Sequence, residues 1–175
     1  MPEQPEIIEL GNPKLRRIAA PVVDATSDCI QRLCDRLLVQ VQEANGVGIA
    51  APQVGESVRL LIVASRPNLR YPNAPTMAPI TMINPRILSH STATEKGWEG
   101  CLSVPGIRGL VPRYQQIEVA YTGRDGRQYQ QTLTDFVARI FQHELDHLDG
   151  KVFLDRVETT HDLMTEQEFR KQFVG

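Results

Sequence analysis

The sequence lacks long apolar runs and any strong excess of charge of one sign. No stretch approaches the roughly 20 apolar residues that a membrane-spanning helix needs, so we expect no membrane segment. The formal net charge of −2 gives no electrostatic reason to expect nucleic acid or a lipid surface as a partner. The first residues, MPEQPEIIEL, resemble neither a secretory signal nor a mitochondrial presequence. We therefore expect a cytoplasmic protein, although an organellar location stays open because a mature chain no longer carries its transit peptide.

Cysteine is also scarce. The three cysteines, Cys29, Cys34 and Cys101, are odd in number and lack the spacing of a disulfide framework. Cys29 and Cys34 lie in a helical pattern, and we predict that both are buried and pack as small apolar residues. Cys101 lies in GWEGCLSVPG, where three glycines allow the backbone to approach a neighbouring group closely.

The remaining composition is that of an ordinary globular protein. The 175 residues, of which 41% are hydrophobic and 23% charged, predict a single domain over residues 1–175. Apolar periodicity predicts an amphipathic helix over residues 27–46 and a second helix over residues 134–150. Short apolar or alternating runs predict strands at residues 58–63, 80–88, around 101–104, 117–122 and 127–133. We therefore expect an α+β fold with mainly antiparallel or mixed sheets packed around the second helix and the first helix on the N-terminal side.

Polar and glycine residues mark the ends of both predicted helices. Ser27 is placed to cap the first helix, and Gly46 follows its end. Thr134 or Asp135 is placed to cap the second helix, which Gly150 stops. The sequence GRDG between the last two predicted strands favours a hairpin turn, and RPNLRYPNAPTMAP is typical of a proline-rich surface loop.

The stretch QHELDHLDG carries the strongest chemical signal. His143 and His147 fall on the same helical stripe as Phe136 and Ile140, and this stripe faces the protein interior. Core histidines that bond backbone carbonyls are the simple alternative. Glu144 completes His-Glu-x-x-His, a spacing that places two nitrogen ligands on one metal ion and a carboxylate beside it. We therefore favour a metal site on this helix.

Two histidines do not complete a catalytic metal site, which needs three protein ligands and one open position. The candidates for the third ligand are His90, Cys101, His161, Glu166 and Glu168. The two glutamates lie in MTEQEFRKQFVG, which we expect to be a polar tail and a poor scaffold for a rigid ligand. The Cys101 thiolate is the preferred third ligand, and a small buried residue in a strand is its alternative.

The stretch GVGIAAPQVG, residues 46–55, contains Gly-x-Gly-x-x-Ala. A dinucleotide-binding loop is disfavoured, because this stretch follows a helix instead of a strand and no phosphate-binding helix opens at Pro52. The alternative is an extended glycine-rich segment beside an active site.

The three blocks GVGIAAPQ, EGCLS and QHELDHLDG, in this order, resemble the three signature motifs of the peptide deformylases. The match is complete at the motif positions, and the chain from GNPKLRRIA onward fits the family's layout. The resemblance implies an enzyme that removes the formyl group from the N-terminal formylmethionine of nascent peptides and releases formate. Its partners would be N-formylmethionyl nascent peptides. A transient ribosome contact stays open, although the last segment is short and mixed in charge compared with the basic helix that some relatives use for docking.

The resemblance also implies a role for each motif residue. Three residues would hold one divalent metal ion: Cys101, His143 and His147. The ion would lower the pKa of a bound water from about 15.7 to about 7 and so supply a nucleophile at neutral pH. Glu144 would act as the general acid and base, and Gln53 with the backbone N–H of Leu102 would bind the developing oxyanion. Zinc, nickel and cobalt suit this mixed ligation, and the resemblance favours ferrous iron as the native ion, Fe2+.

The implied substrate site lies along the glycine-rich segment. The peptide would add as a strand, bonded by backbone groups of Gly46 and Gly48. Val47, Phe136 and Ile140 would form walls of a pocket for the methionine side chain, although core packing explains these three residues equally well.

For several charged residues the sequence allows two interpretations of their role. Arg108 is expected to meet the substrate backbone, with a solvated loop residue as the alternative. Glu99 and Arg113 resemble the structural ion pair of the family, and two unrelated surface charges are the alternative. Asp146 and Asp149 are most simply solvent-facing charges, and a role in supporting the metal ligands from behind is the alternative. Two other functions also stay open. The first is a general metallopeptidase whose third ligand is Glu166 or Glu168. The second is a structural metal module with a fourth protein ligand such as His161.

Overall fold

The computed structural model describes residues 6–174. Its helices are α1 (Asp28–Glu43), α2 (Asp135–Leu148) and α3 (Glu166–Phe173). Its strands are β1 (Gly48–Ala50), β2 (Leu60–Val63), β3 (Ile80–His90), β4 (Thr94–Cys101), β5 (Val104–Tyr114), β6 (Gln116–Thr122), β7 (Gln128–Thr134) and β8 (Leu163–Thr165). A 3-10 turn, η2 (Ala51–Val54), follows β1 directly. None of the helices in this part of the chain combines the length and the apolar character needed to cross a membrane.

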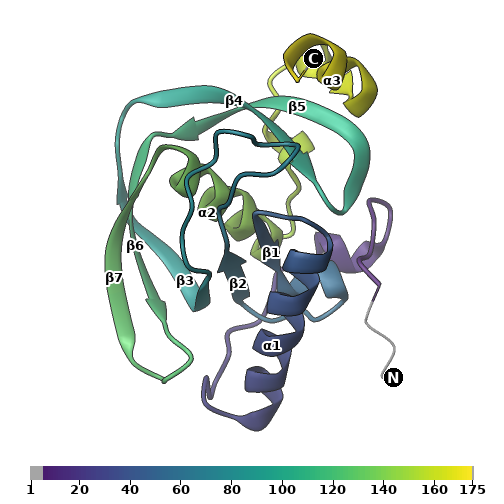
Figure 1. The fold of residues 1–175 in the computed structure, drawn as a ribbon. Coiled ribbons are helices and arrows are strands. Elements are labelled where there is room, and N and C mark those ends of the chain that lie inside the picture. Colours follow the sequence, from purple (N-terminus) through teal and green to yellow (C-terminus); the bar gives the residue numbers. More distant parts are fainter. Residues whose placement is uncertain (1–5, 175) are drawn as a thin grey trace.

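The strands form two sheets, and each neighbouring pair within a sheet runs antiparallel. The first sheet has the order β1-β2-β3-β6-β7, and the second has the order β4-β5-β8. Figure 1 shows α2 in the middle of the molecule, with β3, β6 and β7 on one side and the β4–β5 pair across the top. The predicted α+β class, with antiparallel sheets around the second helix, is confirmed.

Strand β2 explains why the first sheet is covered on both faces. Leu61 and Val63 belong to the apolar cluster that contains the buried face of α2. Leu60 and Ile62 belong to the cluster that contains the buried face of α1. Successive side chains of a strand point to opposite faces, so a continuous apolar run is what a strand between two helices requires. The run at residues 58–63 therefore predicted a buried strand correctly.

The segment around Cys101 differs from its prediction. The chain turns there, so that Cys101 ends β4 and Val104 begins β5, and no single strand spans both. The GRDG hairpin between β6 and β7 is confirmed, since the Gly123 N–H donates to the Arg127 carbonyl at 2.9 Å.

The end of α1 is closed by backbone hydrogen bonds. The Gly46 N–H donates to the Val41 carbonyl at 2.8 Å, and the Asn45 N–H donates to the Gln42 carbonyl at 3.1 Å. These two bonds define a Schellman motif, in which the left-handed residue is Asn45 (φ 52°), and Gly46 follows it after the end of the helix. Ser27 stands at the N-cap, but its hydroxyl donates to a carbonyl preceding the helix instead of accepting from the first turn.

The ends of α2 follow the prediction in part. Thr134 is the N-cap residue, but its side chain makes no capping bond, and Asp135 has a positive φ of 51°. Gly150 follows the C-terminal end with a φ of 71°, a conformation that side chains with a Cβ adopt at a cost.

Two sequence predictions about burial are wrong. Cys34 is buried as expected, but Cys29 is exposed, because it lies in the first turn of α1 and the buried residues of that helix begin at Leu33. The expected polar C-terminal tail instead forms β8, which pairs with β5, and α3. Phe169 of α3 is buried, and its ring centroid lies 5.8 Å from that of Trp98.

We predict that Gly150→Ala lowers the free energy of unfolding by about 2–4 kcal/mol, because of the left-handed backbone and added steric overlap. A Cβ at position 150 would lie 2.6 Å from the carbonyl oxygen of Arg16, a backbone atom that cannot rotate away. Gly106→Ala is the matched control, since Gly106 also has a positive φ (79°) but its Cβ would meet nothing within 4 Å. Urea unfolding should show a loss of about 1–2 kcal/mol for this control. Equal losses for the two variants would contradict the steric account.

Candidate metal centre

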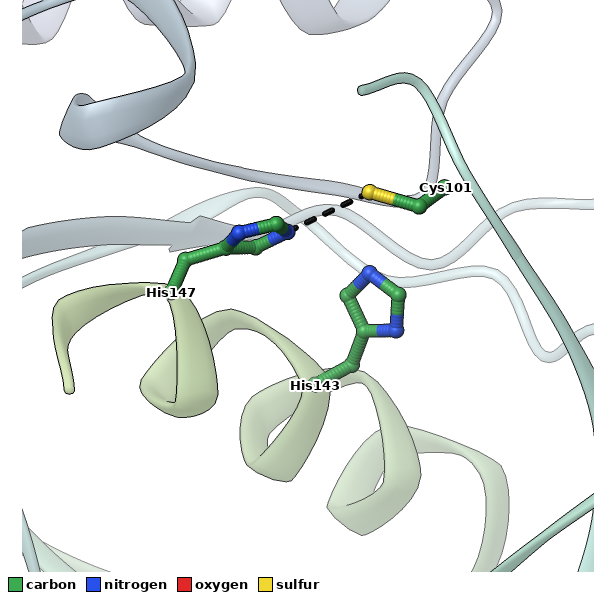
Figure 2. Close-up of side chains that lie close together, drawn as sticks. All are labelled: Cys101, His143 and His147. Atoms are coloured by element: carbon green, nitrogen blue, oxygen red, sulfur yellow. Dashed lines mark hydrogen bonds between the residues drawn. The ribbon is translucent and has the colours of Figure 1, made fainter. Parts of the chain in front are cut away.

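Cys101, His143 and His147 come together from two elements. The ligand atoms of the three residues all lie within 4.8 Å of one another, and the Cys101 Sγ is 3.3 Å from His147 Nε2. Figure 2 shows both imidazoles rising from one face of α2 toward the thiol at the end of β4. Residues four apart in a helix lie one above the other, so the His-Glu-x-x-His spacing produces this arrangement directly. The predicted three-residue ligand group is thus assembled in the structure.

The other candidates for the third ligand lie elsewhere. His90 stacks on Tyr114, with 3.7 Å between ring centroids, and His161 is exposed in a 3-10 turn. Glu166 accepts hydrogen bonds from an arginine, and Glu168 pairs with Lys171 at 2.6 Å. Within residues 6–174, the three-residue group around Cys101 is the one arrangement of histidine, cysteine and carboxylate ligand atoms that meets the geometry of a metal site.

The thiol of Cys101 is prepared to bind a cation. Burial raises the pKa of Cys101, but the charge of His147, followed by contacts with His143, outweighs burial and lowers this pKa to about 5. A thiolate is the form that ligates metals, and a sulfur with two imidazoles is a donor set suited to zinc and its neighbours in the first transition row. The residues present therefore fit a divalent metal ion.

Glu99 fixes the orientation of His143. Its Oε2 lies 2.9 Å from His143 Nδ1, which leaves the other ring nitrogen directed at the metal site. Arg113 donates twice to the Glu99 carboxylate, at 2.9 and 3.0 Å, and Arg139 donates once at 2.9 Å. Burial raises the pKa of Glu99, but the charge of Arg113 dominates the opposing contacts and holds the pKa well below its usual range. A carboxylate behind a ligating imidazole sets its tautomer and increases its basicity as a ligand.

Asp146 belongs to the same network, and the prediction that it faces solvent is wrong. It is buried instead of solvent-facing, and it accepts from Arg113 at 2.6 Å and from Arg156 at 2.8 and 3.2 Å. Arg113 therefore lies between two buried carboxylates, and the predicted ion pair of Glu99 with Arg113 is confirmed as part of a larger network. Asp149 is exposed, as expected, and pairs with Arg59 at 3.0 Å.

Glu144 lies beside the metal-ligating group in a setting that favours its protonated form. Its side chain is buried, and its Oε2 has no hydrogen-bond partner in the part of the chain that the structure describes. Burial raises the pKa of Glu144 to about 7, against the charge of the neighbouring histidines. A Cβ at Gly48 would lie 2.6 Å from Glu144 Oε1, so glycine at position 48 leaves the space that this carboxylate occupies.

Gln53 is held by three contacts. Its Oε1 accepts from the Ala50 N–H at 2.9 Å, and its Nε2 donates to Ser103 Oγ at 3.2 Å and lies 3.6 Å from Cys101 Sγ. Sequence reasoning missed Ser103, although this residue belongs to the EGCLS motif. The amide of Gln53 is therefore fixed next to the sulfur ligand.

A cavity opens to solvent beside the metal-ligating group. Its lining includes every residue predicted for the substrate site except Arg108, together with the predicted oxyanion groups: Gly46, Val47, Gly48, Gln53, Leu102, Phe136 and Ile140. The lining also includes residues that had not been predicted, among them Asn68, Arg70, Tyr71 and Arg139. Arg139 could have been predicted from the sequence, because it precedes His143 by one helical turn and so falls on the same face of the helix. The other three residues lie in the proline-rich loop, which carries no periodic pattern from which to predict them.

Arg108 is buried behind the cavity. Its side chain is fully buried, so the alternative of a solvated loop residue is wrong, and it is not among the residues that line the cavity. Its guanidinium pairs with Glu166 of α3 at 2.6 and 3.3 Å. The same group lies between two rings, 5.1 Å from the Tyr71 centroid and 4.7 Å from the Phe169 centroid. The docking of α3, which the sequence did not predict, places Arg108 behind the cavity wall.

Two histidines on a central helix and a cysteine at the end of a neighbouring strand, with a buried carboxylate at the second position of the helix motif, are typical of a metal-dependent hydrolase. A family profile described as "Polypeptide deformylase" matches residues 5–162. The chain belongs to this family of enzymes, which act on N-formylmethionine peptides, as the three motifs implied.

Individual relatives agree over nearly the whole chain. Peptide deformylase 2 of Nostoc sp. is 62% identical over 170 residues, which cover 97% of this chain and 95% of that protein. Peptide deformylase 2 of Shewanella oneidensis is 45% identical over 95% of this chain and 91% of that protein. The Met-Ala-Ser-bound crystal structure of class I type b peptide deformylase from Acinetobacter baumannii matches with a TM-score of 0.86 and 45% identity, covering 90% of this chain and 100% of that chain. The peptide deformylase structure from Thermotoga maritima matches with a TM-score of 0.79 and 34% identity, covering 90% and 99% of the two chains.

We predict that Cys101→Ser removes most of the bound metal, because an alcohol is a much poorer ligand than a thiolate. Cys29→Ser is the matched control, since Cys29 is exposed and outside the ligand group. Elemental analysis of anaerobically purified protein should find close to one ion per chain in the control and far less in Cys101→Ser. Full metal content in Cys101→Ser would show that Cys101 is not the third metal ligand.

We predict that Glu99→Gln lowers the free energy of unfolding by about 3–5 kcal/mol, because Arg139 loses its carboxylate partner and the buried Arg113 keeps only Asp146. Metal affinity should also fall by about 10- to 100-fold, since the imidazole of His143 loses its carboxylate partner. Glu118→Gln is the control, because Glu118 is exposed and its carboxylate accepts from Ser89 at the surface. Urea unfolding and competition with a metal chelator measure the two effects. A Glu99→Gln protein that matches the control in both would refute the role of this network.

Proposed function

We propose that this chain deformylates the N-terminal formylmethionine of nascent polypeptides by metal-assisted hydrolysis, with Glu144 as the general acid and base. The observation that carries the proposal is the setting of Glu144. Its buried carboxylate has an oxygen without a partner among residues 6–174, it lines the cavity, and it neighbours two residues of the metal-ligating group. A carboxylate with a raised pKa in such a position is suited to proton transfer near neutral pH.

The metal ion would be held by Cys101, His143 and His147. The donor set supports this assignment, because one thiolate and two imidazoles leave a position for solvent or substrate. When bound, the ion supplies Lewis acidity and a water molecule acidic enough to act as a nucleophile at neutral pH. We propose ferrous iron as the native ion, with zinc, nickel and cobalt as ions that the same donors accept.

The proton transfers are assigned to Glu144. Its carboxylate accepts a proton from the attacking water, and it then returns that proton to the amine as the formyl group leaves. Burial supports both steps, since a pKa near 7 makes the two protonation states similar in free energy. Gln53 and the backbone N–H of Leu102 donate to the oxygen that becomes negative in the transition state. The contacts of Gln53 with Ala50 and Ser103 support this assignment, because they hold the amide before substrate arrives.

The peptide substrate is assigned to the cavity. Backbone groups of Gly46 and Gly48 bond the peptide as an added strand, which makes recognition independent of most side chains. Val47, Phe136 and Ile140 form the apolar walls for the methionine side chain. The role of Arg108 is revised to positioning, because its contact with the Tyr71 ring supports the cavity wall from behind.

The cellular setting is part of the same proposal. Newly made formylated chains are the partners, so the protein acts in the compartment of bacterial-type translation, the cytoplasm. Residues 1–175 act as one catalytic domain, because α2 contacts strands of both sheets. Contact with the ribosome is transient, since the acidic and basic residues of α3 are engaged in ion pairs with one another and with β5.

We predict that Glu144→Gln lowers formate release from formyl-Met-Ala-Ser by about 10²–10⁴-fold, because the amide cannot accept and return the proton. The metal content should stay near one ion per chain, since Glu144 is outside the ligand group. Glu118→Gln again serves as the control and should keep full turnover. Retained turnover in metal-loaded Glu144→Gln would rule out the assigned role, and absence of formate from the metal-loaded native sequence would rule out the proposed function.

A further inference from the structure

The outer wall of the cavity is built by the loop between β2 and β3. Within this loop, Asn68 Oδ1 accepts from the N–H groups of Arg70 and Tyr71 at 2.9 and 2.8 Å, which closes a tight turn. The Asn68 side-chain amide donates to the carbonyl of Asn45 at 3.2 Å. The turn is therefore attached to the residue that directly precedes the glycine segment starting at Gly46. A peptide added along that segment lies next to this turn.

Tyr71 fixes the far side of the same turn. Its ring lies 4.9 Å from the ring of Phe136, and its hydroxyl accepts from the Gly100 N–H at 3.3 Å. The Arg108 guanidinium supports the ring from outside, at 5.1 Å from its centroid. Arg70 is thus held between two anchored residues, and it lines the cavity in a half-buried position.

The charge of Arg70 differs from the other cationic charge on the cavity wall. Arg139 is matched, because it donates to Glu99 and to the carbonyls of Val111 and Glu95. The guanidinium of Arg70 makes no ion pair or hydrogen bond within residues 6–174.

The carboxylate that Arg70 influences electrostatically is already engaged. Glu166, whose charge Arg70 influences at longer range, is bound to Arg108 at 2.6 Å and to Arg170 at 3.2 Å. One guanidinium on the cavity wall is therefore left for a carboxylate from outside the chain.

We propose that Arg70 makes the enzyme favour formylated peptides with aspartate or glutamate at the second or third residue. This inference rests on the proposed function, because it takes the cavity to be the peptide site. A guanidinium binds a carboxylate through two parallel hydrogen bonds, and partial burial reduces screening by water and salt. Backbone bonding along the glycine segment treats all sequences alike, so the unmatched charge on the wall is the feature that distinguishes the residues after methionine.

The test compares formate release from pairs of amidated peptides that differ in one charge. The pairs are formyl-Met-Ala-Glu-Ala with formyl-Met-Ala-Gln-Ala, and formyl-Met-Glu-Ala-Ala with formyl-Met-Gln-Ala-Ala. In the native sequence, kcat/KM should favour the glutamate peptide of at least one pair by about three- to tenfold at low salt. This ratio should shrink as salt is added.

Variants assign the preference to Arg70. In Arg70→Gln the glutamate-to-glutamine ratio should fall to about one, whereas Arg70→Lys should keep part of it. Arg70→Glu should favour formyl-Met-Ala-Lys-Ala over the glutamate peptide, a gain that misfolding cannot produce. The matched control is Arg127→Gln, which removes the same charge from an arginine whose side chain is 82% exposed and which is not part of the cavity.

The outcomes separate this inference from the proposed function. Equal kcat/KM for both members of each pair in the native sequence, or an unchanged ratio in Arg70→Gln, would overturn the selectivity assigned to Arg70 while deformylation stands. No formate from any of the peptides with metal-loaded protein would overturn the proposed function and this inference with it.

Discussion

The contact between the buried carboxylate of Glu99 and its three partners is the interaction on which both the fold and the site depend. An ionised carboxylate inside a protein is costly unless it is paired and fully hydrogen-bonded. Glu99, with 2% of its surface exposed, meets that requirement through Arg113 on β5 and through Arg139 and His143 on α2. Glu99 lies on β4, which also carries Cys101, and two of its partners lie on α2, which carries both ligating histidines, so pairing this charge joins the two elements that supply the ligands.

Two glycines beside the site, Gly48 in the first motif and Gly97 two residues before the second, lie against side chains of α2. A Cβ at Gly48 would lie 2.6 Å from Glu144, and a Cβ at Gly97 would lie 2.7 Å from the guanidinium of Arg139. Both positions need a residue without a side chain because a functional group of α2 fills the space. The three sequence motifs are therefore one spatial unit, in which the charged helix supplies the chemistry and the glycines bring β1 and β4 close enough to enclose it.

The site was predictable from sequence where the signal was local. The spacing of His143 and His147 fixed one helical face, and the apolar run of β2 predicted its burial on both sides. The interactions that were missed join residues far apart in the chain, such as Arg108 with Glu166, which is 58 positions away. A charged residue has no periodic signature that reveals whether its partner is water or another buried charge, and for this reason the burial of Asp146 and the docking of α3 did not follow from the sequence.

The inner end and the outer wall of the cavity differ in whether their charged side chains are paired, and we assign the chemistry to the first and the selectivity to the second. Near the metal-ligating group both Arg113 and Arg139 have carboxylate partners, so the inner end presents a fixed arrangement of these charges to any formylated methionine. At the outer wall the Arg70 charge is unmatched and half-buried, and a contact with partial access to water is worth about three- to tenfold in rate. A preference of that size is compatible with an enzyme that processes many proteins, because backbone bonding still provides most of the affinity for every chain. A stronger preference would require burial of the guanidinium, and burial would in turn demand a permanent carboxylate partner of the kind that Arg113 and Arg139 already have.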